Sequence, residues 1–330
     1  MASIMLRRSP VSASLLHFAD PLEPVSGSPR ISLSSQQLRK LMLKADAHGV
    51  LPATLRHFPI SAENLEMERV CVEANSRRIQ ALARSTMLAW HAESIVSADK
   101  ALAATVVKGP VFAQRLYPPR LRSFADIDIL AATEALPQLA AILHSQGFLR
   151  VEGLDPRRME DIWVHHENEV LIVETHTDLV HSARNREAFS LTYDDIEGNA
   201  DAPGTLLVIA IIHGCIHYFA LLRHAVDICQ AARALKTTAE ESRFESLVDR
   251  AQMRLGAVVG LMLAWRLFGE VRCIEVARAL GPIRAFRFAR LLIEGSVLSA
   301  PMNSWIIYNS WRRFVFRELL RYGTLHSSAS

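Results

Sequence analysis

The chain has few of the features that would connect it to an oxidising compartment or to a nucleic-acid surface. Only four of its 330 residues are cysteines, and none of them forms a C-x-x-C pair. They are Cys71, Cys215, Cys229 and Cys273. This wide spacing argues against a disulfide framework or a zinc site, and it favours reduced thiols and a cytoplasmic location. The net charge of +3 is too small to imply nonspecific binding of nucleic acid.

Long hydrophobic runs are also missing. The closest approach to one, residues 291–308, is interrupted by Glu294, Pro301 and Asn303, so we expect no membrane-spanning helix. Residues 1–30 contain Ser, Pro and Arg but no long apolar segment, which favours a flexible N-terminal arm over a signal peptide. Apolar residues nevertheless make up 50% of the chain, enough to bury a sizeable core.

Hydrophobic periodicity divides the rest of the chain into three regions. Residues 31–103 are expected to be helical, and the helix over 35–47 shows apolar side chains at i, i+3 and i+4. Residues 104–203 mix short β-branched runs with helical stretches, and residues 204–330 are helical again. We therefore predict an α+β fold, in which N-terminal and C-terminal helical regions flank a small mixed β-sheet.

A lysine and a glycine end the first predicted strand of the mixed region. The β-branched run 105–107 precedes Lys108 and Gly109, and Pro110 then opens a short helix over 111–117. A strand, a glycine turn and a helix N-terminus together form an anion site, because free N–H groups and the helix dipole face a phosphate placed there. Lys108 adds a full charge. An ordinary turn with a solvated lysine is the alternative.

Two acidic residues follow in an apolar run. On a strand, Asp126 and Asp128 would share one face while Ile127 and Ile129 share the other, because side chains alternate. Like charges side by side on a half-buried strand repel each other and resist desolvation, and a bound divalent cation relieves both effects. The alternative is a solvated strand end, which is common for an isolated Asp-x-Asp pair.

A third acid lies near the end of a predicted hairpin. The runs 162–166 and 170–176 are strand-like, and the polar segment 167–169 joins them. Strand parity places Glu174 and His176 on one face. Glu174 could complete a set of oxygen ligands of the kind that Mg²⁺ prefers, or it could be a surface acid. His176 could be a partner of the carboxylates, a contact to a base or acceptor, or a structural residue.

Together these residues resemble a bacterial family of uncharacterised nucleotidyltransferases in the DNA polymerase β-like superfamily. The similarity lies in the order K-G, Y-P, R, D-I-D-I-L, a helix closing in Gly-Phe, and V-E-T-H. It is carried by Lys108, Gly109, Tyr117, Pro118, Arg122, Asp126, Asp128, Gly147, Glu174 and His176. AbiEii-type toxins share the K-G and D-x-D core. Pro110 departs from the Gly-Ser or Gly-Gly of many members, which would shift phosphate binding to backbone N–H groups, Lys108 and Arg122.

The resemblance implies a nucleotidyltransferase core that moves a nucleoside monophosphate from an NTP, with ATP the first candidate. The acceptor would be a hydroxyl or similar group on a small molecule, peptide, saccharide or RNA. Asp126, Asp128 and Glu174 would be catalytic and would hold Mg²⁺. The nucleotide-binding residues would be Lys108, Gly109, Arg122 and His176. A non-catalytic nucleotide-binding or regulatory protein, and a toxin-like enzyme acting on RNA, are the alternatives.

The C-terminal region carries histidines and arginines whose roles stay open. His213, His217 and His224 lie on one predicted helix over 206–235, with Asp227 three residues beyond. They could bind a metal, form a polar face toward the active-site cleft, or be structural. The arginines could form a solvated helix face or contact a phosphate-bearing acceptor such as RNA. They are Arg284, Arg287, Arg290, Arg312, Arg313, Arg317 and Arg321.

Overall fold

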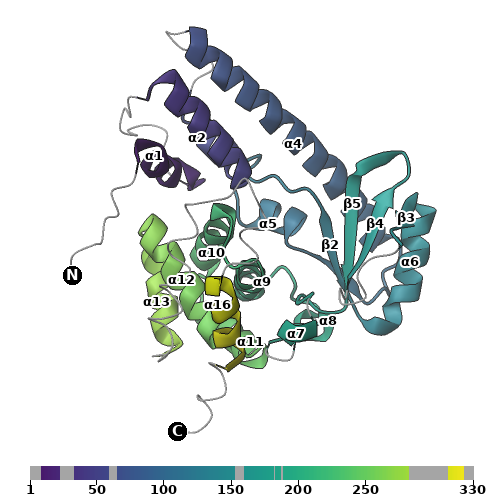
Figure 1. Cartoon of the computed structure of the whole chain (residues 1–330). Coiled ribbons are helices and arrows are strands. Elements are labelled where there is room, and N and C mark those ends of the chain that lie inside the picture. Colours follow the sequence, from purple (N-terminus) through teal and green to yellow (C-terminus); the bar gives the residue numbers. More distant parts are fainter. Residues whose placement is uncertain are drawn as a thin grey trace.

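The fold is α+β, as predicted, with helices surrounding a five-stranded mixed sheet (Figure 1). The computed structural model describes residues 9–22, 33–58, 65–152, 160–181, 183–186, 189–281 and 311–322. The sheet lies on one side of the molecule and the C-terminal helices lie on the other (Figure 1). The long helix α4 (Leu65–Ser97) runs past the sheet and packs on β1, β2 and β5.

The strand order of the sheet is β1-β2-β5-β4-β3. The strands are β1 (Ala104–Val107), β2 (Ile127–Ala131), β3 (Phe148–Arg150), β4 (Glu160–His165) and β5 (Asn168–His176). β2 pairs with β5 in parallel, whereas the other neighbours are antiparallel. β2 is therefore an interior strand, and β4 and β5 form the predicted hairpin.

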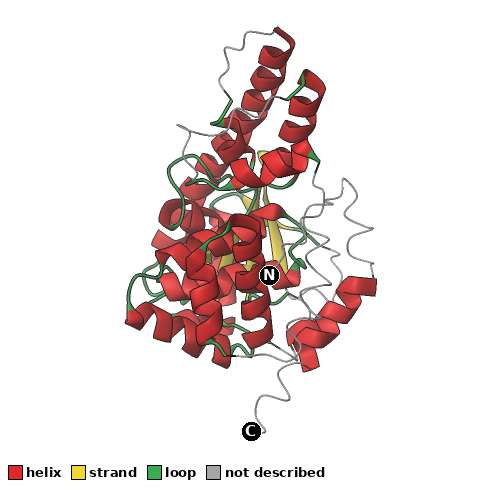
Figure 2. Ribbon diagram, turned by 90° about the vertical axis from the view of Figure 1, so that its left-hand side faces the viewer, coloured by secondary structure: helices red, strands yellow, loops and turns green. Residues whose placement is uncertain are grey.

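The two faces of β2 contact different cores. Ile127 and Ile129 face a core that includes residues of α4 and α6 (Leu136–Ser145). Leu130 belongs to the core built by the N-terminal and C-terminal helices, and Asp128 lines a cavity. This alternation confirms the predicted parity of the strand. Helices lie in front of the strands in the view of Figure 2, which agrees with the burial of every residue of β2.

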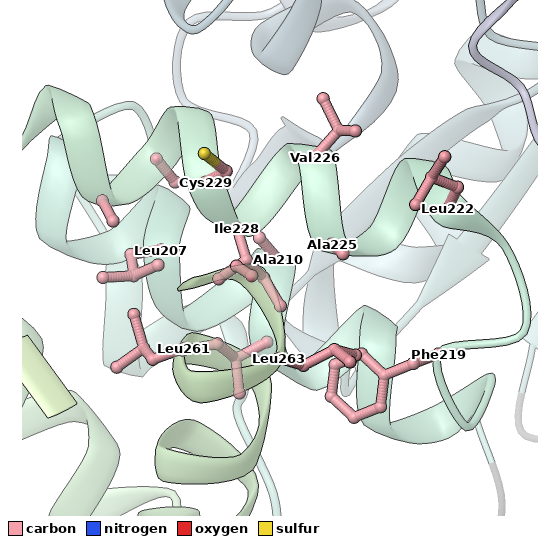
Figure 3. Close-up of a cluster of buried hydrophobic side chains, with 14 of the residues drawn as sticks. Leu207, Ala210, Phe219, Leu222, Ala225, Val226, Ile228, Cys229, Leu261 and Leu263 are labelled. Atoms are coloured by element: carbon pink, nitrogen blue, oxygen red, sulfur yellow. The ribbon is translucent and has the colours of Figure 1, made fainter. Parts of the chain in front are cut away.

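One large hydrophobic core joins helices from opposite ends of the sequence. The N-terminal contributors are α1 (Pro10–Ala19), α2 (Ser35–Ala47), α3 (Leu51–Leu55) and the N-terminal half of α4. The C-terminal ones are α9 (Pro203–Ile216), α10 (Leu222–Ala234), α11 (Thr238–Arg250), α12 (Arg254–Phe268), α13 (Val271–Ala279) and α16 (Trp311–Tyr322). Figure 3 shows side chains of α9, α10 and α12, such as Leu207, Ile228 and Leu261, meeting in this core. The shorter helices are α5 (Gly109–Arg115), η1 (Thr133–Ala135), α7 (Ala183–Arg186) and α8 (Tyr193–Ile196).

Residues 10–19 are not part of a flexible arm, so that expectation was wrong for this segment. They form α1, whose N-cap Ser9 accepts a hydrogen bond from the backbone of Ser12. Leu15 and Phe18 are buried in the core. The segment is helical because its apolar side chains find a surface on distant helices, which its polar surroundings in sequence do not reveal. Residues 1–8 and 23–30 lie outside the described part of the chain.

Asp20 ties α1 to α10. Its carboxylate accepts two hydrogen bonds of 2.7 Å from the Arg233 guanidinium and one of 3.2 Å from the Gln230 amide. Burial alone would raise the pKa of Asp20, but the bonds from Arg233 and the other donors hold it below its usual value. The ionised carboxylate therefore stabilises the folded protein.

We expect Asp20→Asn to lower the free energy of unfolding by about 1–3 kcal/mol, because a buried ion pair loses one charge. Since the folded pKa lies below the unperturbed 3.8, the contribution is present above pH 3.8 and is lost as the pH falls further. Urea unfolding at neutral and acidic pH measures both effects. Asp46→Asn, which removes only an exposed pair with Arg77, is the control. If Asp20→Asn and Asp46→Asn lowered the free energy of unfolding equally, the buried pair of Asp20 and Arg233 would not be the stabilising contact.

The helix predicted over 206–235 is in fact two helices, α9 and α10. Tyr218 and Phe219 between them have φ values of 52° and 51°. The Phe219 ring folds back on Gly214, where a Cβ atom would lie 2.5 Å from the ring. Neither proline nor glycine occurs between the two helices. The break therefore depends on tertiary packing, which the sequence pattern did not reveal.

Three further observations concern the cysteines, membrane-spanning helices and the C-terminal arginines. The four cysteines are buried free thiols. Within the described ranges, no helix has both the length and the apolar character needed to cross a membrane, and residues 291–308 lie outside those ranges. Of the C-terminal arginines, Arg317 lies 3.5 Å from Glu318 and packs over the ring of Phe314. The side chains of the other six lie outside the described residues.

Candidate active site

A cavity of about 520 Å³ lies between the sheet and the helices α9 and α10. Its lining residues are Lys108, Gly109, Arg122, Phe124, Asp126, Asp128, Glu160, Glu174, His181, His213, Ile216, His217 and Arg223. The acids come from the sheet and the segments beside it, whereas His213 of α9, the α9 C-cap His217 and Arg223 of α10 line the opposite side. The volume is typical of small-molecule sites, which span about 300–1,000 Å³.

Lys108 occupies the tight turn between β1 and α5. Its φ of 57° and ψ of −122° are unfavourable for a residue with a Cβ atom and easy for glycine. The helix begins at Gly109, with Pro110 in its first turn. A Cβ atom on Gly109 would lie 3.2 Å from the carbonyl oxygen of Asp126, so glycine permits the turn to approach the acidic segment. A lysine kept in a strained position indicates that its side chain is needed there.

Lys108 and Asp128 form a buried ion pair. The lysine Nζ lies 2.5 Å from Asp128 Oδ1, and the two side chains are 8% and 6% exposed. Burial alone would lower the pKa of Lys108 and raise that of Asp128. The opposite charges outweigh burial, so the pKa of Lys108 is raised and that of Asp128 is held well below its usual value. Both groups are therefore charged at neutral pH.

The parallel register of β2 and β5 places Asp128 directly opposite Glu174. Potential ligand atoms of Asp128, Glu174 and His176 all lie within 4.8 Å of one another, and Asp126 lines the same cavity. Burial and the charge of Asp128 raise the pKa of Asp126, and burial and the two aspartates raise that of Glu174 to about 8. The three predicted acids thus meet at one wall of the cavity, where their carboxylates repel one another.

His176 is a partner of the carboxylates, which is one of the three roles considered for it. Its Nε2 lies 3.1 Å from Asp128 Oδ1, and its Nδ1 lies 3.0 Å from His181 Nδ1. The residue is 1% exposed, and the residues lining the cavity do not include it. These contacts do not favour the expected contact between His176 and the nucleotide.

Arg122 lines the cavity, but its guanidinium is already engaged. Its Nε and Nη2 donate to the Asp227 carboxylate at 2.8 and 3.0 Å, and its Nη1 donates to the Gly109 carbonyl at 3.1 Å. Tyr117 donates its hydroxyl to the same carboxylate at 2.5 Å. Arg122 therefore holds the Lys108–Gly109 turn against α10. Its contact with a phosphate stays a prediction.

Three ionisable residues of the cavity were not identified from the sequence. Glu160 pairs with His176 in the β4–β5 register, so extending the predicted hairpin by two residues would have found it. His181 follows β5, and Arg223 lies in the first turn of α10. Arg223 Nε is buried and has no hydrogen-bond partner among the described residues. No sequence pattern marks His181 or Arg223, because only tertiary packing brings them to the acids.

The histidine stripe faces the cavity in part. His213 and His217 line it, and the His224 ring lies 4.8 Å from that of His213. Burial and the nearby charge of Lys108 lower the pKa of His213, and the same causes lower that of His217 to about 4. Within the described part of the chain, the stripe is not among the groups whose ligand atoms converge. This arrangement favours a neutral polar wall over a metal site.

The mixed sheet and its acid-lined cavity are consistent with the nucleotidyltransferase class of enzymes. The sequence model of a family described as uncharacterised nucleotidyltransferases matches residues 34–269, and the chain belongs to this family. No curated protein and no solved structure matches the chain. The protein is therefore a transferase of nucleotidyl groups, and a nucleotide is its substrate.

Proposed function

We propose that the protein transfers a nucleoside monophosphate from an NTP, with ATP the first candidate, in a reaction that depends on Mg²⁺. The acceptor is a hydroxyl or similar group on a small molecule, peptide, saccharide or RNA. One observation carries this proposal: Asp126, Asp128 and Glu174 line one cavity, in a chain that belongs to a family described as uncharacterised nucleotidyltransferases. A divalent cation would neutralise charge that is this crowded.

The residues present fit such an ion. Carboxylate oxygens are the ligands that Mg²⁺ prefers, and Asp126, Asp128 and Glu174 would hold it. When bound, Mg²⁺ supplies charge neutralisation at the phosphates and at the attacking oxygen. A bound cation would keep the Glu174 carboxylate ionised, and the ionised carboxylate can take the proton of the acceptor. His176 keeps the Asp128 carboxylate in place through its 3.1 Å contact.

Cationic side chains complete the phosphate side of the cavity. The Lys108 ammonium is held by Asp128 and can exchange this carboxylate for a phosphate oxygen. Arg223 brings a second charge to the cavity, and its buried Nε still needs an acceptor. We therefore add Arg223 to the residues proposed to contact the triphosphate. In such a reaction the protein mainly positions groups and balances charge.

A labelling experiment tests the proposal. The protein is incubated with Mg²⁺, each labelled NTP in turn, and a cell extract as the source of acceptors. We expect one NTP to label an acceptor and, together with Mg²⁺, to raise the melting temperature of the protein. A rise in melting temperature without transfer would instead support a regulatory nucleotide-binding protein. Neither effect with any NTP would contradict the proposal.

We expect Lys108→Ala to weaken NTP binding by about 1–3 kcal/mol, the range for a hydrogen bond to a charged group. Calorimetry measures the NTP affinity. The loss of Lys108 also leaves Asp128 without its cation and destabilises the fold, so the measurement is made below the melting temperature of the variant. Lys100→Ala, which removes an exposed lysine, is the matched control. Unchanged affinity in Lys108→Ala would rule out its contact with the triphosphate.

A further inference from the structure

A second group of potential metal ligands lies beside the three acids, at the end of β5. It consists of Glu160, His176 and His181. The two histidine Nδ1 atoms are 3.0 Å apart, and Glu160 Oε2 lies 3.1 Å from His181 Nδ1 and 4.0 Å from His176 Nδ1. The side chains of Glu160, His176 and His181 are 10%, 0% and 16% exposed. Three atoms with lone pairs therefore converge in a largely buried place.

The separations between these atoms suit a tetrahedral transition-metal ion. Zinc binds imidazole nitrogen and carboxylate oxygen at about 2.0–2.2 Å, so two tetrahedral ligand atoms lie about 3.3–3.5 Å apart. The observed 3.0, 3.1 and 4.0 Å bracket this value. Small side-chain rotations would equalise them.

His176 has the surroundings of a metal-ligating histidine. Such residues usually donate the other ring N–H to a carboxylate, which fixes the tautomer and leaves a lone pair for the metal. Here Nε2 faces Asp128 Oδ1 at 3.1 Å, and Nδ1 faces His181 and Glu160. With that tautomer, a single proton on His181 Nδ1 would have to serve both the His176 lone pair and the Glu160 carboxylate. A cation satisfies all three atoms.

We infer that Glu160, His176 and His181 bind a divalent transition-metal ion of the Zn²⁺ type, at a site separate from the carboxylates proposed for Mg²⁺. Two imidazole nitrogens and one carboxylate oxygen suit zinc, cobalt, nickel or iron, whereas Mg²⁺ prefers oxygen ligands. The site joins the first residue of β4, the last residue of β5 and the segment after it. The ion holds His176 in place and, through it, the Asp128 carboxylate. This inference does not depend on the identity of the transferred nucleotide.

Cobalt is the probe, because Co²⁺ occupies zinc sites and absorbs visible light. The full-length protein is freed of metal with a chelator and titrated with Co²⁺, and Zn²⁺ is then added to displace it. We expect a single tight equivalent of Co²⁺ with a visible absorption band that Zn²⁺ abolishes. His181→Ala and Glu160→Gln should weaken binding more than the roughly 10–100-fold typical of losing a second-layer partner.

Two matched variants separate this site from its neighbours. Glu174 belongs to the adjacent ligand group but not to this one, and His217 lies on the α9 side of the cavity. Glu174→Gln and His217→Ala should therefore keep the Co²⁺ band. The inference is overturned if the wild-type protein lacks tight binding, or if Glu174→Gln removes the band while His181→Ala keeps it. Circular dichroism shows whether each variant is folded. If His181→Ala does not fold, the loss of Co²⁺ binding is judged from the isosteric variant Glu160→Gln instead. Because no nucleotide is present, a negative result leaves the proposed transfer reaction untouched.

Discussion

Asp126→Asn should reduce nucleotidyl transfer by a factor on the order of 10³ or more while the protein remains folded. An amide keeps the shape of the side chain but removes the charge that would hold the divalent ion, and such an ion contributes several kcal/mol to the transition state. Burial and Asp128 raise the pKa of Asp126, so the substitution also removes repulsion. Stability in the presence of a chelator should therefore hold or rise.

Asp128→Asn should abolish transfer as well, but at a cost in stability. Asp128 is the buried partner of Lys108, and breaking such a pair costs about 3–5 kcal/mol. Transfer assays and thermal unfolding in a chelator distinguish the two aspartates. Asp161→Asn, on β4 but outside the cavity, is the control and should retain activity. Wild-type transfer rates in either cavity variant would show that the metal assignment is wrong.

Glu174→Gln should retain most of the NTP affinity and lose transfer by a factor on the order of 10²–10⁴, as expected for the loss of a general base. Asp126 and Asp128 would still hold the ion at the phosphates, so binding and chemistry separate. Calorimetry measures the NTP affinity, and single-turnover kinetics measure the rate of transfer. Unchanged transfer in this variant would mean that another group accepts the proton of the acceptor.

The same variant makes an independent prediction about stability. The pKa of Glu174 is raised from 4.5 to about 8, so the folded protein holds this proton more tightly than the unfolded chain. The contribution of Glu174 to wild-type stability should therefore fall as the pH rises from 4.5 to about 8, and the comparison with Glu174→Gln isolates that contribution. Without metal, Glu174→Gln should be more stable than the wild type by up to about 4–5 kcal/mol near pH 8, and the two proteins should be equally stable near pH 4.5. Glu169→Gln, at an exposed position of β5, should show no such dependence.

The sequence by itself determined those features of the site that repeat locally. Strand alternation predicted that Asp128 turns away from Ile127 and Ile129, because successive Cβ atoms point to opposite faces. The hairpin of β4 and β5 followed from two strand-like runs around a polar turn. Backbone geometry dictates these relations over a few residues, so they can be predicted without knowledge of the fold.

Only the tertiary structure decided which distant segments meet. The register that sets Asp128 opposite Glu174 joins strands that are far apart in the chain. Asp227 holds Arg122 and Tyr117 across more than a hundred residues, and α1 packs with helices from the C-terminal half. Such contacts depend on complementary packing and on pairing buried charges, which leave no periodic signal in either segment alone. For this reason His181 and Arg223 could be recognised only in the folded protein.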